Sequence, residues 1–439
     1  MRWAKISWML AILGLLGVQY PVLAGESIGS KQSVIPAKLV KTDNAWTILR
    51  NGEPYFIKGA GGSRYLQKLA QSGANSVRTW STDDAQRILD EAHQYGLTVM
   101  LGLRMGKERH GFDYSDKEAV AAQKAQIREQ VLKYKDHPAL LVWGIGNELD
   151  LFYTNTNVWY AVEEIAAMIK TLDPHHLVTT VTAGINKEKA ALITERVPSI
   201  DYLSINIYGG LENLPADLLE IGYQGPYVVT EWGPTGHWEI AKTDWGAPIE
   251  QSSTEKAAIY RKRYEQGILA APKRALGSYA FLWGQKQETT PTWYGVFTEA
   301  GKPTEVVDTL SYLWRGQWPT QRAPSISAYT LGGKSATQSL RVKPGQLVSV
   351  ELSYTTGDKE EVAIQWEILP ESTDIKAGGD PERRPKARDI EFVSGHQPGH
   401  MQFKVPVQPG PYRLFVYVEN AAGKVANANF PFFVEQAME

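Results

Sequence analysis

Two glutamates, each at the end of an apolar segment, are the residues of this chain best suited to chemistry. Glu148 follows the apolar run Leu140–Ile145, and the residue before it is the amide Asn147. Glu231 ends a second apolar run, which begins at Tyr227. Two carboxyl groups that face each other can work as proton donor and nucleophile when their surroundings separate their pKa values. The sequence therefore predicts a paired-carboxylate site, provided that the fold brings the two segment ends together.

The elements that must position these residues follow an alternating pattern. Between residues 55 and 314, short apolar segments alternate with segments of helical period, which gives eight strand–helix units in 260 residues. Such units pair their strands in parallel, and eight of them are typical of a (β/α)8 TIM barrel. A doubly wound sheet is the alternative, but the glycine cluster Gly59–Ser63 is a weak match to a phosphate-binding loop. We predict an α/β barrel within residues 25–320, with a short hairpin that turns at Asn51–Gly52.

This barrel would bring the two glutamates together. Glu148 would end the fourth strand and Glu231 the seventh, and active sites of these barrels lie at the carboxyl ends of the strands. A retaining glycosidase needs two such carboxyl groups ~5–5.5 Å apart. Arg78, near the end of the second strand, and Tyr208, after the sixth, could bind Glu231 and favour its ionised form. Glu148 would then face a negative charge and keep its proton, and Asn147 could hold a sugar hydroxyl.

The segments VWGIGNE and VVTEWG resemble the strand ends of retaining glycoside hydrolases that carry the acid/base on strand four and the nucleophile on strand seven. The most similar families are family 2, which holds β-galactosidases and β-glucuronidases, and family 5, which holds cellulases and mannanases. The resemblance covers roughly residues 40–315. It implies that Glu148 is the acid/base and Glu231 the nucleophile. By the same resemblance, Arg78, Asn147 and Tyr208 match supporting positions. Trp283, on the eighth strand, matches the tryptophan that lies under the sugar at the cleavage site.

Aromatic residues gather in the loops expected after strands four, seven and eight. Aromatic rings suit the apolar faces of pyranose sugars and bury a large area, so these loops predict a cleft that holds several sugars. Among them we expect Trp232 to contact substrate. His110, after the third strand, is a further candidate contact on the same face. The loop aromatics are Phe152, Tyr153, Trp159, Trp232, Trp238, Trp245, Trp293 and Tyr294.

Each of these residues also has a purely structural alternative. Glu148 could belong to a buried ion pair, Arg78 could seal the barrel, and Trp283 could fill the core. The matching position of Glu231 on its own strand favours the catalytic interpretation, because a lone structural glutamate needs no such partner.

Composition narrows the range of partners and cofactors. The formal net charge is −2 and no dense Lys/Arg block occurs, which argues against nucleic acid as the main partner. The chain has no Cys, so it can form neither a disulfide nor a thiolate metal site. No HxH or HExxH spacing occurs, and we expect neither a catalytic metal nor another cofactor.

The first 24 residues have the features of a signal peptide. Arg2 and Lys5 precede the apolar run ISWMLAILGLLGV, which is too short to span a bilayer comfortably, and Val22-x-Ala24 offers a small-residue cleavage site. We expect cleavage after Ala24, a secreted or periplasmic protein, and no stable membrane span afterwards. An uncleaved anchor is the alternative.

The sequence pattern changes after Trp314. Short alternating runs separated by turn residues fill residues 325–439 and predict an immunoglobulin-like β-sandwich. The segment Ala377–Arg388 predicts a mobile charged loop. In the resemblance to family 2, β-domains precede the barrel, whereas here the sandwich follows it.

These expectations define one leading hypothesis and two rivals. The leading one is a secreted retaining β-glycosidase that hydrolyses or transglycosylates β-linked oligo- or polysaccharides by double displacement. The second is a non-catalytic carbohydrate-binding protein of the cell envelope, and the third is a barrel enzyme with metal-assisted chemistry. Sugar, linkage and oligomeric state stay open.

Overall fold

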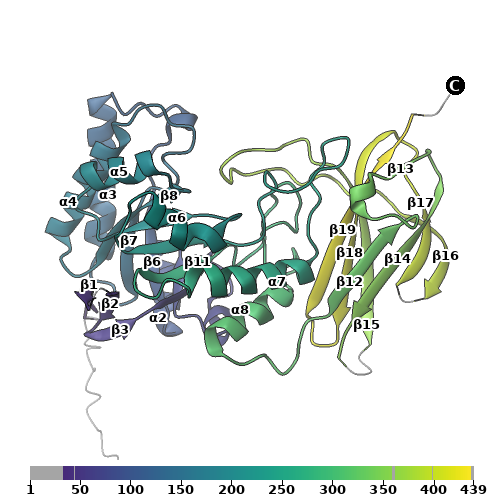
Figure 1. Ribbon diagram of the computed structural model, residues 1–439, viewed down its shortest axis with the longest axis horizontal. Coiled ribbons are helices and arrows are strands. Elements are labelled where there is room, and N and C mark those ends of the chain that lie inside the picture. Colours follow the sequence, from purple (N-terminus) through teal and green to yellow (C-terminus); the bar gives the residue numbers. More distant parts are fainter. Residues whose placement is uncertain (1–32, 44, 358–360, 398, 437–439) are drawn as a thin grey trace, which may run out of the picture. The chain divides into compact units, whose positions relative to one another are not determined.

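A computed structural model describes residues 33–43, 45–357, 361–397 and 399–436 of the protein (Figure 1). The expected signal peptide lies outside these residues. Among the helices that are described, none combines the length and the apolar character needed to cross a membrane.

Eight parallel strands close into a barrel in the order β10-β11-β4-β5-β6-β7-β8-β9, so the predicted (β/α)8 fold is confirmed. Each strand is nearly fully buried, because its two faces pack against the barrel interior and the surrounding helices. The barrel strands are β4 (Ile57–Gly61), β5 (Ser76–Arg78), β6 (Thr98–Leu103), β7 (Leu140–Ile145), β8 (Leu177–Ala183), β9 (Tyr202–Asn206), β10 (Tyr227–Trp232) and β11 (Ala275–Ala280).

A helix follows each barrel strand, and local signals fix where several of them begin. Asp116 caps α3 by accepting hydrogen bonds from the backbone of its first turn, and Ser252 and Glu255 form a reciprocal capping box at α7. The helices are α1 (Leu66–Gln71), α2 (Ala85–Gln94), α3 (Lys117–Tyr134), α4 (Val158–Leu172), α5 (Lys187–Arg196), α6 (Leu214–Glu220), α7 (Ser253–Arg263) and α8 (Glu305–Arg315), with the short turns η1 (Glu108–His110), η2 (Leu211–Asn213) and η3 (Tyr264–Ile268).

A small antiparallel sheet closes the amino-terminal end of the barrel. It consists of β1 (Ala37–Thr42), β2 (Ala45–Arg50) and β3 (Glu53–Tyr55), and the predicted turn at Asn51–Gly52 has the positive φ angles of a tight hairpin. Ile48 packs into the same apolar cluster as residues of the barrel interior. Because this end is filled, the other end of the barrel is left for a site.

Two four-stranded sheets form the predicted carboxyl-terminal β-sandwich, drawn in green to yellow in Figure 1. Their inward side chains form shared apolar clusters between the sheets. One sheet has the order β12 (Ser325–Leu331), β14 (Leu347–Thr355), β17 (His400–Lys404) and β16 (Glu391–Gln397); the other has the order β13 (Arg341–Val342), β19 (Val425–Val434), β18 (Gly410–Asn420) and β15 (Val362–Pro370), and the turn η4 (Ala336–Gln338) precedes β13.

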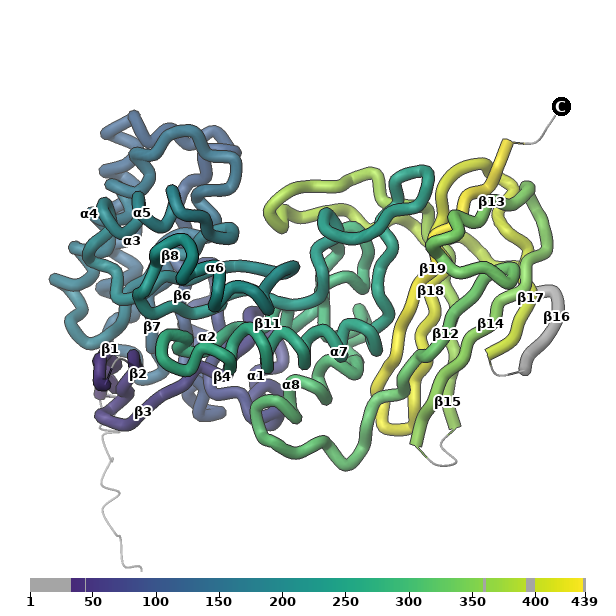
Figure 2. The backbone as a smooth tube through the Cα atoms, viewed as in Figure 1, coloured from purple at the N-terminus to yellow at the C-terminus, as the bar shows by residue number. Residues whose placement is uncertain are grey.

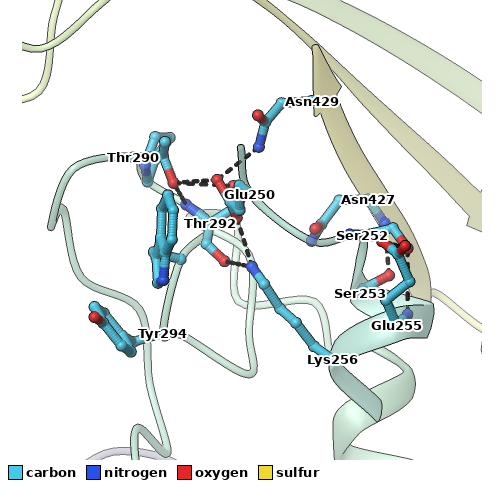
Figure 3. A network of polar contacts seen from close by, with 12 residues as sticks. Glu250, Ser252, Ser253, Glu255, Lys256, Thr290, Thr292, Tyr294, Asn427 and Asn429 are labelled. Carbon is cyan, nitrogen blue, oxygen red and sulfur yellow. Dashed lines mark hydrogen bonds and ion pairs between the residues drawn. The ribbon is translucent and has the colours of Figure 1, made fainter. Parts of the chain in front are cut away.

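A buried polar network joins the sandwich to the barrel (Figure 3). The carboxylate of Glu250 accepts hydrogen bonds from Lys256 at 2.5 Å, from Thr290 at 2.5 Å and from Asn429 of β19 at 2.6 Å. Arg413 of β18 donates to the carbonyl of Pro248 at 2.8 Å. The buried charge of Glu250 is therefore satisfied from both sides of the junction.

Candidate active site

The carboxylate of Glu231 is held in place by its strand and by three donors. A register shift between Val229 and Glu231 in the β10–β9 pairing marks a bulge, and bulges near active sites re-aim side chains. Arg78 donates to Glu231 Oε1 at 3.0 Å, and the indole of Trp80 donates to the same oxygen at 2.7 Å. The hydroxyl of Tyr208 donates to Oε2 at 3.1 Å.

These contacts surround the carboxyl group of Glu231 with hydrogen-bond donors. The residue is 6% exposed, so water contributes little to its solvation. A cation and two neutral donors take the place of that water around its oxygens. The predicted contacts of Arg78 and Tyr208 with Glu231 are therefore present in the structure.

Glu148 projects from a tight turn directly after β7. Gly146 and Glu148 have φ angles of 66° and 50°, in the left-handed region that non-glycine residues seldom occupy. The backbone N–H of Glu148 donates to the carbonyl of Val181 at 2.9 Å, which fixes the turn against β8. At Glu148 this strained conformation falls on a residue with a candidate chemical role, a pattern seen at functional sites.

The carboxyl group of Glu148 differs from that of Glu231 in its surroundings. Burial, and then the negative charge of Glu231, raise the pKa of Glu148 to about 7. Asn206 donates to Glu148 Oε1 at 2.9 Å and opposes this shift. One carboxyl group is thus ion-paired while the other retains its proton near neutral pH, which is the division of roles that acid and nucleophile require.

An amide network connects the two carboxyl groups. Arg78 donates to Asn147 Oδ1 at 2.5 Å, and Asn206 Nδ2 lies 3.3 Å from the same oxygen. Asn206 Oδ1 in turn accepts from Thr230 at 2.9 Å. Because Asn206 also contacts Glu148, rotation of any one of these side chains would leave a buried donor or acceptor unpaired.

Both carboxyl groups line one cavity of about 1850 Å³ at the carboxyl ends of the barrel strands. Of the other predicted site residues, Asn147, Tyr208 and His110 also line it, whereas Arg78 lies beneath it, 1% exposed. Among the loop aromatics, Phe152 and Trp238 reach the cavity and are 69% and 55% exposed.

Two predicted substrate contacts are placed elsewhere and need correction. Trp232 is fully buried between Tyr260 and Tyr264, because neighbouring residues of a strand point to opposite faces and Glu231 already points to the mouth. Trp283 is 1% exposed and packs against Trp314 of α8. Neither side chain lines the cavity.

Phe281, which the sequence reasoning missed, takes the place expected for Trp283. It follows β11 directly, lines the cavity, and packs edge-on against Trp80 and Tyr208 with ring centroids 5.7 and 6.0 Å apart. Its ring therefore positions both neutral donors to Glu231.

Trp80 and Asn206 were also missed, although the sequence carried a signal for each. Trp80 lies two residues after Arg78 in NSVRTW, and Asn206 ends the segment SIN two residues before Tyr208. Polar or aromatic residues at the carboxyl end of a barrel strand are candidate site residues in the same way as the carboxylates beside them.

Charged groups around the cavity are mostly paired. His110 was predicted to contact substrate. In the structure its ring also contacts the carboxylate of Asp380 at 2.8 Å. Lys107 lines the cavity, and its burial lowers its pKa. Among the described residues no group of three or more His, Cys, Asp or Glu side chains is arranged to hold a metal ion.

A closed eight-stranded barrel with carboxyl groups at the ends of its fourth and seventh strands has the arrangement that glycoside hydrolysis requires. Residues 63–237 match the family model described as glycosyl hydrolases family 2, TIM barrel domain. Within these residues the chain is therefore similar to the barrel domain of that family.

Individual relatives are named as glycosidases. The chain is 30% identical to mannan endo-1,4-beta-mannosidase F of Aspergillus clavatus over 134 residues, which are 30% of this chain and 28% of the relative. It is 22% identical to a beta-glucuronidase of Paenibacillus borealis over 337 residues, which are 67% of this chain and 55% of the relative. The chain thus spans between about a quarter and just over half of these two relatives.

Solved structures show the same fold at low identity. A beta-glucuronidase of Bifidobacterium dentium, complexed with coumarin-3-O-glucuronide, matches with a TM-score of 0.51 and 18% identity, covering 64% of this chain and 49% of that chain. A beta-glucuronidase of Bacteroides uniformis matches with a TM-score of 0.50 and 15% identity, covering 91% of this chain and 48% of that chain.

Proposed function

We propose that the protein is a retaining β-glycosidase, with Glu231 as nucleophile and Glu148 as acid/base. The observation that carries this proposal is the contrast between two carboxyl groups of one cavity. Glu231 is ion-paired to Arg78 and bound by two further donors, whereas burial and the charge of Glu231 raise the pKa of Glu148 to about 7.

In the first step, Glu231 attacks the anomeric carbon and the bond to the leaving oxygen breaks. Glu148 transfers its proton to that oxygen, which departs as an alcohol and leaves a covalent glycosyl–enzyme ester. Arg78 keeps its positive charge but loses its ionised partner as Glu231 forms the new bond. Loss of this ion pair costs free energy. The proton transfer from Glu148 offsets this cost, because it leaves a negative charge on Glu148 near Arg78.

In the second step, Glu148 is ionised and acts as a base. It removes a proton from water, or from a sugar hydroxyl in a transglycosylation, and the oxygen attacks the anomeric carbon. The ester bond breaks, Glu231 regains its charge, and Glu148 regains its proton. The configuration at the anomeric carbon is retained because it is inverted twice.

The relatives support a β-linked substrate. Two classes named among them, a β-mannosidase and β-glucuronidases, act on different sugars, so the shared element is the β-linkage and not the sugar. Export to the periplasm or the medium belongs to the same proposal and rests on the signal-peptide features of residues 1–24.

Azide rescue of two alanine variants tests the assignment and distinguishes the two roles. We expect Glu231→Ala to lose about 10⁴-fold or more of kcat, and azide to give the α-glycosyl azide in one inversion. We expect Glu148→Ala to retain turnover of substrates with activated leaving groups, and azide to give the β-glycosyl azide through the intact Glu231 ester. Product configuration is read by NMR.

Glu239→Ala is the matched control, since Glu239 also lines the cavity but, among the described residues, accepts its hydrogen bonds from the backbone of Gly209 and Gly236. Azide should leave its rate unaltered. Unchanged activity of Glu231→Ala on a substrate that the wild type cleaves would rule out the proposed nucleophile.

A further inference from the structure

We propose that the loop between β15 and β16 of the sandwich forms one wall of the substrate cleft and binds sugar units beyond the one that is cleaved. We call residues 371–390 the sandwich loop. The inference rests on the proposed function, because it names the length of glycan that the same site accepts. Its first support is direct: seven successive residues of the loop, Ile375–Pro381, line the cavity that holds Glu148 and Glu231.

An ion-pair cluster ties the tip of the sandwich loop to the barrel loop after β6. Arg109 donates to both carboxylate oxygens of Asp380, at 2.6 and 3.0 Å, and His110 lies 2.8 Å from one of them. Bidentate pairs of this kind fix orientation as well as distance. The hydrogen bonds from Arg109 contribute most to lowering the pKa of Asp380 to about 2.

A second set of contacts ties the loop to the barrel segment after β11. Lys286 donates to the carbonyl of Gly379 at 2.6 Å, and the backbone N–H of Thr289 donates to Glu382 at 2.6 Å. In the barrel order, β4 and β5 separate β11 from β6. The sandwich loop is therefore attached on two sides of the mouth, and the sequence-based expectation of a mobile segment is replaced by an anchored one.

Glycine allows the loop to approach the barrel closely. Gly378 has a φ of 62°, and a Cβ added there would lie 2.6 Å from Leu151 and 2.8 Å from Arg109. Leu151 follows the turn of Glu148, so the sandwich loop lies against the segment that carries the proposed acid/base.

The cavity wall also offers exposed apolar surface from three separate segments. Phe152 after β7, Trp238 after β10 and Ile375 of the sandwich loop are 69%, 55% and 50% exposed, and all three line this cavity. Exposed apolar groups in a concave site indicate a ligand surface, and such groups suit pyranose faces.

The volume of about 1850 Å³ exceeds the range of roughly 300–1,000 Å³ usual for drug-sized ligands. The cleft therefore has room for an oligosaccharide.

Figure 2 shows the backbone course of this loop, which leaves the sandwich sheet in yellow-green. Because it comes from the second domain, the sandwich would contribute to substrate choice as well as to stability. A wall in this position should affect kcat/KM for long substrates. It should have little effect on kcat/KM for substrates that occupy only the position of the cleaved sugar.

Gly378→Leu tests the proposal without removing a charged group, because the added side chain must displace the loop tip from Leu151 and Arg109. Gly423→Leu is the matched control: Gly423 lies in the β18–β19 turn with a φ of 70°, and a Cβ there meets no atom within 4 Å. Ile375→Ala, with Val407→Ala as control, removes one apolar contact; Val407 is 75% exposed. Melting temperatures verify that all variants fold.

The readout is the ratio of kcat/KM for a hexasaccharide to kcat/KM for the 4-nitrophenyl β-glycoside of the same sugar. The hexasaccharide is the best substrate of the wild type among mannohexaose, cellohexaose and laminarihexaose. We expect Gly378→Leu to lower this ratio at least ten-fold, mainly through KM, and Ile375→Ala to lower it about three-fold. The two control variants should keep the wild-type ratio.

Binding measurements separate this proposal from the proposed catalysis. Calorimetry of Glu148→Gln with the same hexasaccharides needs no turnover, and adding Gly378→Leu should weaken binding at least ten-fold. An unchanged ratio and unchanged binding would overturn the proposal, as would failure of the wild type to bind any of the three sugars. If the sugars bind but the Glu231 variant stays active, the catalytic assignment fails and the loop assignment stands.

Discussion

Arg78 of β5 and Glu231 of β10 form a buried ion pair across the interior of the barrel mouth, with Arg78 Nη1 3.0 Å from Glu231 Oε1. Their side chains are 1% and 8% exposed, so each charge depends on the other. A buried pair of this kind stabilises little by itself, but loss of one partner leaves an isolated charge in a dry site.

Arg78→Met should therefore reduce both stability and catalysis. We expect a loss of about 3–5 kcal/mol in the free energy of unfolding at pH 7 and a drop in kcat of at least about 10²-fold, because Glu231 would lose the cation that binds and orients its carboxylate. Urea unfolding and steady-state kinetics measure the two effects. Arg87→Met is the control, since Arg87 pairs with Glu91 on an exposed face and should cost about 1 kcal/mol or less. A fully active Arg78→Met would contradict the proposed role.

The pKa of Glu148 predicts the alkaline side of the pH profile. Glu148 must be protonated to donate to the leaving oxygen, and its pKa is raised to about 7. We expect kcat/KM to fall above about pH 7, approaching a tenfold loss per pH unit. The same profile measured with a 2,4-dinitrophenyl glycoside should lose this fall, because that leaving group needs no proton. A fall in kcat/KM that is identical for both substrates would assign it to another group.

The same raised pKa predicts a stability effect. Because the pKa of Glu148 rises on folding from 4.5 to about 7, the protonated residue is tolerated below pH 4.5, and stability is lost as the pH rises through about 7. Glu148→Gln should therefore stabilise the protein above pH 7, by at most about 3 kcal/mol, and change little near pH 4. Thermal unfolding at pH 4 and pH 8 measures this difference. Equal effects at both pH values would show that the titration of Glu148 is not the cause.

Phe281 and Trp283 should respond in opposite ways to truncation. Phe281 packs on Trp80 and Tyr208, so Phe281→Ala should free both donors to Glu231 and lower kcat by about ten-fold or more. Trp283 fills the core beside Trp314, so Trp283→Phe should lower the melting temperature and leave kcat within about two-fold. Kinetics of both variants, taken well below their melting temperatures, separate the two roles. A large loss of kcat in Trp283→Phe alone would instead support the sequence-based prediction that Trp283 lies under the sugar at the cleavage site.

The architecture and the paired carboxylates could be predicted from sequence because both depend on local pattern. Strand and helix periods alternate eight times, and Glu148 and Glu231 each end an apolar strand. Knowing which strands face each other then places Arg78 beside Glu231. Alternation of side chains within β10 would also have excluded Trp232, since it directly follows Glu231.

The rest of the site depends on contacts that no local pattern encodes. Asp380 meets Arg109 from 271 positions along the chain, and its segment looks like an ordinary charged turn. Asn206 gains its importance from simultaneous contacts with Asn147 and Glu148. Such residues become recognisable only when the strands and loops that carry them are placed in space.

The junction between the two domains offers a test of how the sandwich supports the barrel. Glu250 and Lys256 are 1% and 6% exposed and pair at 2.5 Å, and Asn429 of β19 donates to Glu250 at 2.6 Å. Lys256→Met should lower the free energy of unfolding by about 3–5 kcal/mol, because it leaves the buried carboxylate of Glu250 without its cation. Adding Glu250→Gln should recover part of that loss, since the amide carries no charge and can still accept from Asn429. Lys404→Met, which removes an exposed pair with Glu391, should cost about 1 kcal/mol or less. Chemical unfolding of the wild type, Lys256→Met, Glu250→Gln and the double variant gives the coupling energy between Glu250 and Lys256. If the double variant were no more stable than Lys256→Met alone, the loss would come from packing at Lys256 and not from the stranded charge.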